Sequence, residues 1–138
     1  MTPMSIELTM LCASVALLIV LVLIQANAGV MAQGLLPMAG NRDHLKEPSV
    51  WQARTKRCVD NHREGLLMFA PLIIVAHIYN VTGSDLTLYG AQMFFYSRVA
   101  HAIVYLAGWP YIRPLFWGIG LIGTLMIFYA LLPLLKFT

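Results

Sequence analysis

A long uncharged segment near the start of the chain constrains the fold more than any other feature. No Asp, Glu, Lys or Arg occurs between Glu7 and Arg42, and the residues from Leu8 to about Leu36 are almost all apolar. About 20 apolar residues are enough for one helix to cross a bilayer. We therefore predict a membrane-spanning helix over about residues 5–36.

A cleavable signal peptide is the alternative interpretation of this segment, because Ala26-Asn27-Ala28 resembles a cleavage site. However, no Lys or Arg precedes the apolar run, and the run continues beyond that point through Val30 and Leu35. Both features favour a helix that is retained in the protein.

Three further apolar segments predict helices over about residues 54–81, 86–108 and 115–135. Pro71 lies inside the first of these, where neighbouring helices can satisfy the backbone groups that a proline frees. Of the 138 residues, 59% are hydrophobic and 11% are charged, whereas about a quarter are charged in a typical soluble domain. We expect residues 1–138 to form a single all-α membrane domain, a bundle of four transmembrane helices.

The Lys and Arg residues are distributed unevenly between the two predicted membrane faces. With Arg98 left out because it lies inside a helix, the face that carries the first and third loops receives seven of them and the other face receives only Lys136. Because cytoplasmic loops are enriched in Lys and Arg, we expect the first face in the cytoplasm and both termini outside it. The seven residues are Arg42, Lys46, Arg54, Lys56, Arg57, Arg63 and Arg113.

Nucleic acid is not an expected partner, although the net charge is +3. Binding to nucleic acid is typical of basic patches with interleaved aromatic residues, and the Lys and Arg residues here are scattered between apolar segments instead. The bilayer itself is the expected surroundings of the chain.

Polar residues form a stripe on the second predicted helix. Their spacing of i, i+3, i+7 and i+10 puts them within an arc of about 80° on an ideal helix. The stripe is either a solvated helix end with internal pairing or one side of a ligand site. Its members are Arg54, Arg57, Asn61 and Glu64.

The third predicted helix carries a second polar set, formed by Arg98, His101 and Tyr105. These residues lie within about 60° of one another on an ideal helix. Ionisable groups within a membrane span are costly and usually face a bundle interior or a cavity. A structural network of hydrogen bonds between helices is the other interpretation of this set.

Both polar sets reach the same membrane face, and Arg113 lies just beyond the second. Guanidinium groups suit carboxylates, and the Glu64 carboxylate suits an ammonium group. The combined charges therefore fit a small zwitterion with extra carboxylates, such as the tripeptide glutathione.

Metal and haem sites are not expected. His77 and His101 differ in depth by roughly 18 Å at 1.5 Å per residue, so one haem cannot bind both. His62 has no further ligands at suitable spacing. Cys58 is adjacent to Arg57 in sequence but points away from the polar stripe, so we expect an inert thiol.

Two blocks of sequence resemble the MAPEG family, the membrane-associated proteins of eicosanoid and glutathione metabolism. The first block covers residues 54–64 (RTKRCVDNHRE) and precedes an apolar helix. The second covers residues 98–106 (RVAHAIVYL), with Tyr111-Ile112-Arg113 beyond it. The resemblance extends from Arg42 to the last helix and includes the plan of four spans.

The resemblance implies a homotrimer in which glutathione lies between subunits, bound by the first two helices of one subunit and the last two of its neighbour. It implies that Arg113 faces the thiol and acts as the catalytic residue by stabilising a thiolate. The activated sulfur would then attack a lipophilic electrophile or hydroperoxide from the bilayer. Together with the two polar sets, it predicts these glutathione-binding residues: Arg54, Arg57, Asn61, Glu64, Arg98, His101 and Tyr105.

Several positions depart from the pattern of better-known members. Asp60 stands where an Arg is common, and Gln25 and Asn27 carry no positive charge in the first helix. Pro114 and Trp117 replace hydroxyl residues after Arg113. Two functional hypotheses follow: a glutathione-dependent membrane transferase or peroxidase, and a non-enzymatic membrane protein of the same fold that binds a lipid or a protein partner.

Overall fold

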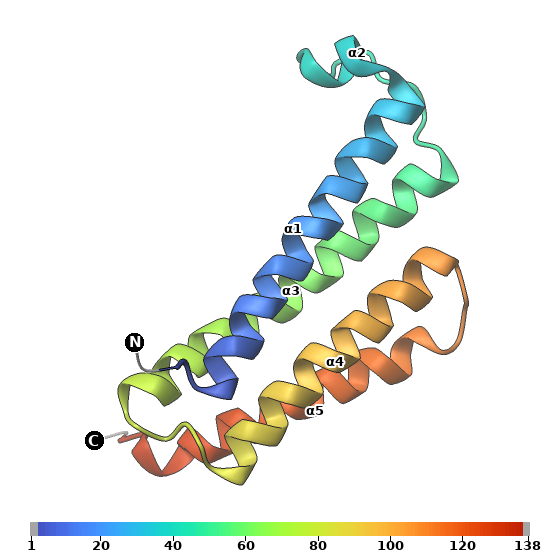
Figure 1. Ribbon diagram of the computed structural model, residues 1–138. Helices are drawn as coiled ribbons and strands as arrows, with labels where there is room; N and C mark the ends of the chain where they lie inside the picture. Colours follow the sequence, from blue (N-terminus) through green and yellow to red (C-terminus); the bar gives the residue numbers. More distant parts are fainter. Residues whose placement is uncertain (1–2, 137–138) are drawn as a thin grey trace.

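The computed structural model describes residues 3–136, and its regular secondary structure in that range consists of helices alone, as predicted. The long helices run alternately up and down and form two hairpins, α1 with α3 and α4 with α5, that pack side by side (Figure 1). The long helices are α1 (Ile6–Gln33), α3 (Val50–Ile78), α4 (Asp85–Ala107) and α5 (Arg113–Leu131); the short ones are α2 (Leu35–Ala39) and the 3-10 turn η1 (Leu132–Leu134).

The observed helix boundaries differ from those predicted by up to about four residues, and two of the differences have clear local reasons. The Ser49 hydroxyl accepts a hydrogen bond from the Gln52 amide (3.1 Å), so α3 is capped and begins at Val50 rather than near residue 54. Gly34 has a φ of 90°, a conformation that favours glycine. This residue separates α1 from α2, so the helix predicted over residues 5–36 is interrupted.

α1 contacts the rest of the bundle along a narrow seam. Its buried residues include Glu7, Ser14, Leu21 and Ala28, which recur at every seventh position. A seven-residue period keeps one face of a helix toward its neighbour. Many of the other positions expose large apolar side chains, such as Leu23, as expected for a helix that lipid surrounds.

Close packing at glycines joins α4 to α5, and stacked aromatic rings join α4 to α3. A Cβ atom placed on Gly90 of α4 would lie 2.6 Å from the Gly123 carbonyl oxygen of α5, so these two backbones touch. The rings of Phe69 on α3 and Phe94 on α4 stack with centroids 3.9 Å apart. The ends of α4 and α5 are therefore held in a defined position relative to α3.

Two of the four predicted spans stand out by length and composition among the described residues. These are α1 and the segment Arg113–Leu134, with mean hydropathies of 2.6 and 2.1. α3 and α4 contain 29 and 23 residues, and a helix of 20 residues is already about 30 Å long. Charged and polar residues, such as Arg57 on α3 and Arg98 on α4, lower the hydropathy of these two helices. They are long enough to span a membrane but not apolar enough to be identified in the same way.

The two ends of the bundle carry different connections. The start of α1, the α3–α4 turn and the end of α5 lie at one end, and α2 and the α4–α5 connector lie at the other (Figure 1). At the first end the Glu7 carboxylate accepts hydrogen bonds from the Gly83 amide (2.6 Å) and the Thr87 hydroxyl (2.8 Å). At the second end the Gln33 side chain accepts a hydrogen bond from the Lys46 amide (2.9 Å) and donates one to the Lys46 carbonyl oxygen (3.0 Å). The connections richest in Lys and Arg thus share one end of the bundle.

Candidate functional site

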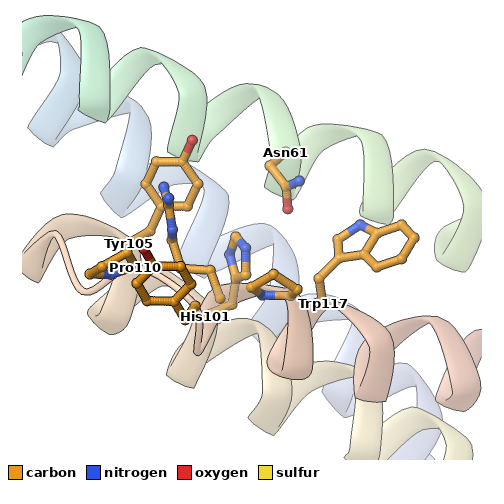
Figure 2. Close-up of a pocket in the computed structure, with 8 residues that line it drawn as sticks. Asn61, His101, Tyr105, Pro110 and Trp117 are labelled. Carbon is orange, nitrogen blue, oxygen red and sulfur yellow. The ribbon is translucent and has the colours of Figure 1, made fainter.

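An open cavity of about 570 Å³ lies between α3, α4 and the start of α5, at the end of the bundle that carries α2 (Figure 2). It brings together one residue of the α3 stripe, two of the α4 set and the predicted catalytic arginine. The remaining lining comes from the α4–α5 connector and the first turn of α5. The lining residues are Asn61, His101, Tyr105, Pro110, Tyr111, Arg113, Pro114 and Trp117.

Arg113, Tyr105 and His101 lie in contact along one wall of this cavity. The ring centroids of His101 and Tyr105, one helical turn apart on α4, are separated by 5.4 Å. The Arg113 guanidinium carbon lies 4.7 Å from the centroid of the Tyr105 ring, which is a cation–π distance. Pro114 begins α5 next to Arg113, where its fixed φ suits the first turn of a helix. This start orients Arg113 toward α4.

Arg98 lies deeper than predicted, inside the bundle. It is only 2% exposed, and its Nη1 donates to the Asn61 Oδ1 at 2.7 Å. Gly65 makes room for it, because a Cβ atom there would lie 2.7 Å from the guanidinium carbon. Its guanidinium has no ion-pair partner within 4.0 Å in residues 3–136. Arg98 therefore orients Asn61 toward the cavity and does not line the cavity itself.

Arg57 and Glu64 are exposed on α3 and do not line the large cavity. Arg57 lines a separate hollow of about 200 Å³ between α1 and α3, together with Gln25 and Gln52. Within one subunit, the structure does not bring these two charged residues together with Arg113. Of the residues predicted for the site, Asn61, His101, Tyr105 and Arg113 line the large cavity, and Arg57 lines a different hollow.

Arg54 also points away from the large cavity. Its Nη1 lies 3.4 Å from the Leu106 carbonyl oxygen, at the end of α4. The guanidinium therefore bridges α3 and the last turn of α4.

Three polar residues near the stripe have structural surroundings. The His62 Nε2 lies 2.9 Å from the Ser14 carbonyl oxygen, in the interface of α1 and α3. Cys58 is buried in an apolar cluster, which agrees with the inert thiol predicted for it. Asp60 accepts hydrogen bonds from Lys56 (2.7 Å) and Arg63 (2.8 Å) on the exposed side of α3.

The connector between α4 and α5 contributes residues that were not predicted as part of the site. Pro110 and Tyr111 line the cavity, and Tyr111 is 91% exposed with a φ of 67°. Trp117, noted in the sequence only as a departure, lines the cavity from α5 and lies on the same side of it as Asn61 (Figure 2). In the sequence, this part of the cavity wall is marked by two prolines, Pro110 and Pro114, among the aromatic residues of segment 109–117.

Comparisons with known proteins identify a family. No curated protein and no solved structure gave a significant match to the chain. The sequence model of the MAPEG family matches residues 8–133, which is nearly the whole chain and includes both sequence blocks on which the resemblance rests. Together with the two strongly apolar helices, this match indicates an integral membrane protein. The chain belongs to the MAPEG family.

Proposed function

We propose that this protein binds glutathione at the large cavity and acts as a membrane glutathione transferase or peroxidase on a lipophilic substrate. The convergence of Arg113, Tyr105, His101 and Asn61 on one cavity carries the proposal. These residues supply a guanidinium, a phenol, an imidazole and an amide, which are donors and acceptors suited to a charged peptide.

Arg113 is the residue that would change the reactivity of the ligand. In residues 3–136 it forms no ion pair, so its charge is not neutralised by a carboxylate of the same subunit. An unperturbed thiol has a pKa of about 8.5, and a nearby guanidinium in a site shielded from water lowers that value. Bound glutathione supplies the nucleophilic sulfur for attack on an electrophile or hydroperoxide. Arg113 would hold that sulfur in its thiolate form.

We further propose a homotrimer of four-span subunits with the glutathione site between neighbours. The division of the charged residues supports this arrangement, because Arg57 and Glu64 are exposed on α3 while Arg113 lines a cavity that they do not reach. A second copy of the chain that packs its α3 against this cavity would complete the charge pattern for a zwitterion. Arg57 of this second copy would then bind the peptide and its Glu64 the ammonium group, while Asn61 of the first copy contacts the peptide from within the cavity.

A non-enzymatic role is the second candidate, and one observation favours it. Pro114 follows Arg113 and has no side-chain donor, and Trp117 carries no hydroxyl group. The phenols of Tyr105 and Tyr111 are the hydroxyl groups among the residues that line the cavity. If neither phenol supports a thiolate, the site binds its ligand without activating it.

Calorimetric titration of the detergent-purified protein with glutathione tests the binding proposal. The parent should show saturable binding, and Arg57→Met should weaken it about tenfold or more, as expected for loss of a charge-assisted hydrogen bond. Arg63→Met is the matched control, because Arg63 lies on the same helix but pairs with Asp60. Equal binding by the two variants, or no binding by the parent, would contradict the proposal.

A further inference from the structure

A positively charged side chain from the other hairpin, Arg54, lies at the C-terminal end of α4. The Arg54 guanidinium of α3 reaches across to the last turn of α4, where its Nη1 lies 3.4 Å from the Leu106 carbonyl oxygen. This distance is long for a hydrogen bond, so the contact is mainly electrostatic. The last carbonyls of a helix carry a partial negative charge that a cation stabilises.

The local geometry of this helix end is built around the guanidinium. Gly108 ends α4 in the left-handed conformation with a φ of 80°. The amides of Gly108 and Trp109 donate to the carbonyls of Tyr105 and Val104, both at 3.1 Å. These bonds satisfy two of the last carbonyls of the helix and leave the Leu106 carbonyl to Arg54.

Gly108 is also the residue against which Arg54 packs. A Cβ atom at this position would lie 2.8, 2.9 and 3.0 Å from three atoms of the Arg54 guanidinium. The left-handed backbone therefore favours glycine, and any side chain at this position would displace the Arg54 guanidinium. The guanidinium lies flat against the chain where α4 ends and the connector begins.

The connector that starts here carries the cavity wall. Residues 109–112 lead directly from the cap of α4 to Arg113, and Pro110 and Tyr111 within them line the cavity. A change in the direction of the chain at Gly108 would therefore move the catalytic arginine relative to Tyr105.

We propose that Arg54 is a positioning residue, which fixes the α4–α5 connector and through it Arg113, and that it does not bind a ligand carboxylate. This assignment differs from the ligand role that the sequence predicted for Arg54. The effect on glutathione rests on the proposed function, but the effect on the connector does not.

Hydrogen exchange of the full protein in detergent tests the effect on the connector without any ligand. Arg54→Met should accelerate exchange of the Gly108 and Trp109 amides about twofold to tenfold, the range for loss of a cation at a helix C-terminus. Arg54→Lys should keep part of the protection. Arg57→Met, one turn further along α3, should leave both amides unchanged. Parent-like exchange in Arg54→Met would overturn the proposal. If Arg54→Met does not fold, Arg54→Lys decides instead: a partial loss of protection supports the proposal, and parent-like exchange overturns it.

Titration with glutathione separates positioning from ligand binding. Arg54→Met should raise the pH midpoint of the thiolate absorbance of bound glutathione and change the Kd less than about threefold, whereas Arg57→Met should mainly weaken binding. A Kd raised tenfold or more in Arg54→Met, with unchanged amide exchange, would make Arg54 a ligand-binding residue and overturn the proposal. If the parent shows no thiolate signal, the proposed enzymatic function fails, and the exchange experiment still decides the role of Arg54.

Discussion

The guanidinium of Arg113 is held against the face of the Tyr105 ring, 4.7 Å from its centroid, rather than by a carboxylate. An aromatic face attracts a cation without neutralising its charge as an ion pair would. In residues 3–136 the ion pairs are those of Asp60 with Lys56 and Arg63, on the exposed side of α3. The charge of Arg113 therefore remains available to an anion that enters the cavity.

Glu64 is expected to bind the ammonium group of glutathione. Glu64→Gln should weaken glutathione binding by about 1.5 to 3 kcal/mol, because it removes the charged partner of a charge-assisted hydrogen bond. Asp60→Asn is the matched control, since Asp60 already pairs with Lys56 and Arg63 on the same helix. Calorimetry measures both, and a Glu64→Gln protein that binds as well as the parent would return the α3 stripe to a solvated helix end.

A site between subunits predicts complementation between two defective variants. Arg113→Leu and Glu64→Gln disable opposite halves of the proposed site, so each homotrimer has only defective sites. Co-expression should produce mixed trimers in which some interfaces combine an intact Arg113 with an intact Glu64 from the neighbour. Recovery of the thiolate absorbance in tandem-purified mixed protein, at a glutathione concentration too low to saturate Glu64→Gln and with trimers seen by native mass spectrometry, is the expected result. Monomers, or no recovery in mixed trimers, would place the whole site in one subunit.

Gly65 is predicted to be required for the burial of Arg98. A Cβ atom at Gly65 would lie 2.7 Å from the Arg98 guanidinium carbon, so Gly65→Ala should destabilise the protein by about 1 to 3 kcal/mol through overpacking. Gly118→Ala is the matched control, because nothing lies within 4 Å of a Cβ atom there. The control should be neutral or stabilising by up to about 1 kcal/mol. Thermal unfolding in one detergent compares them, and equal losses would contradict the packing account.

The uneven distribution of Lys and Arg predicts that both termini lie outside the cytoplasm. A C-terminal reporter that works only in the cytoplasm should therefore give no signal, and the same reporter inserted in residues 40–49 should be active. The end of α5 and residues 40–49 lie at opposite ends of the bundle (Figure 1). The reverse pattern of signals would mean that the orientation is inverted.

Helical periodicity predicted which residues share a helix face, and this is where the sequence was most informative. Arg98, His101 and Tyr105 were grouped correctly on one side of α4, and two of them line the cavity. Periodicity does not determine how far a long side chain reaches or which neighbour it meets. Arg98 turns inward to Asn61, and Arg54 reaches the end of α4, because glycines on the facing chain leave room for each guanidinium.

The segments between helices were the least predictable. The break at Gly34 depends on its backbone conformation, and the course of residues 40–49 depends on the two hydrogen bonds between the Gln33 side chain and the Lys46 backbone. Neither feature has a helical period that marks it in advance. The same holds for Tyr111, which lines the cavity from a connector and not from a helix face.

The ultraviolet absorbance of thiolate tests the central claim most directly, since thiolate absorbs where thiol does not. Glutathione added to the parent between about pH 6.5 and 8, below the ordinary thiol pKa, should produce a thiolate absorbance. Arg113→Leu should abolish this absorbance while weakening binding only modestly, because Arg113 acts on the sulfur and other residues bind the peptide. Tight binding of glutathione by the parent without any thiolate absorbance in this pH range would contradict catalysis by thiolate activation and leave only a binding role.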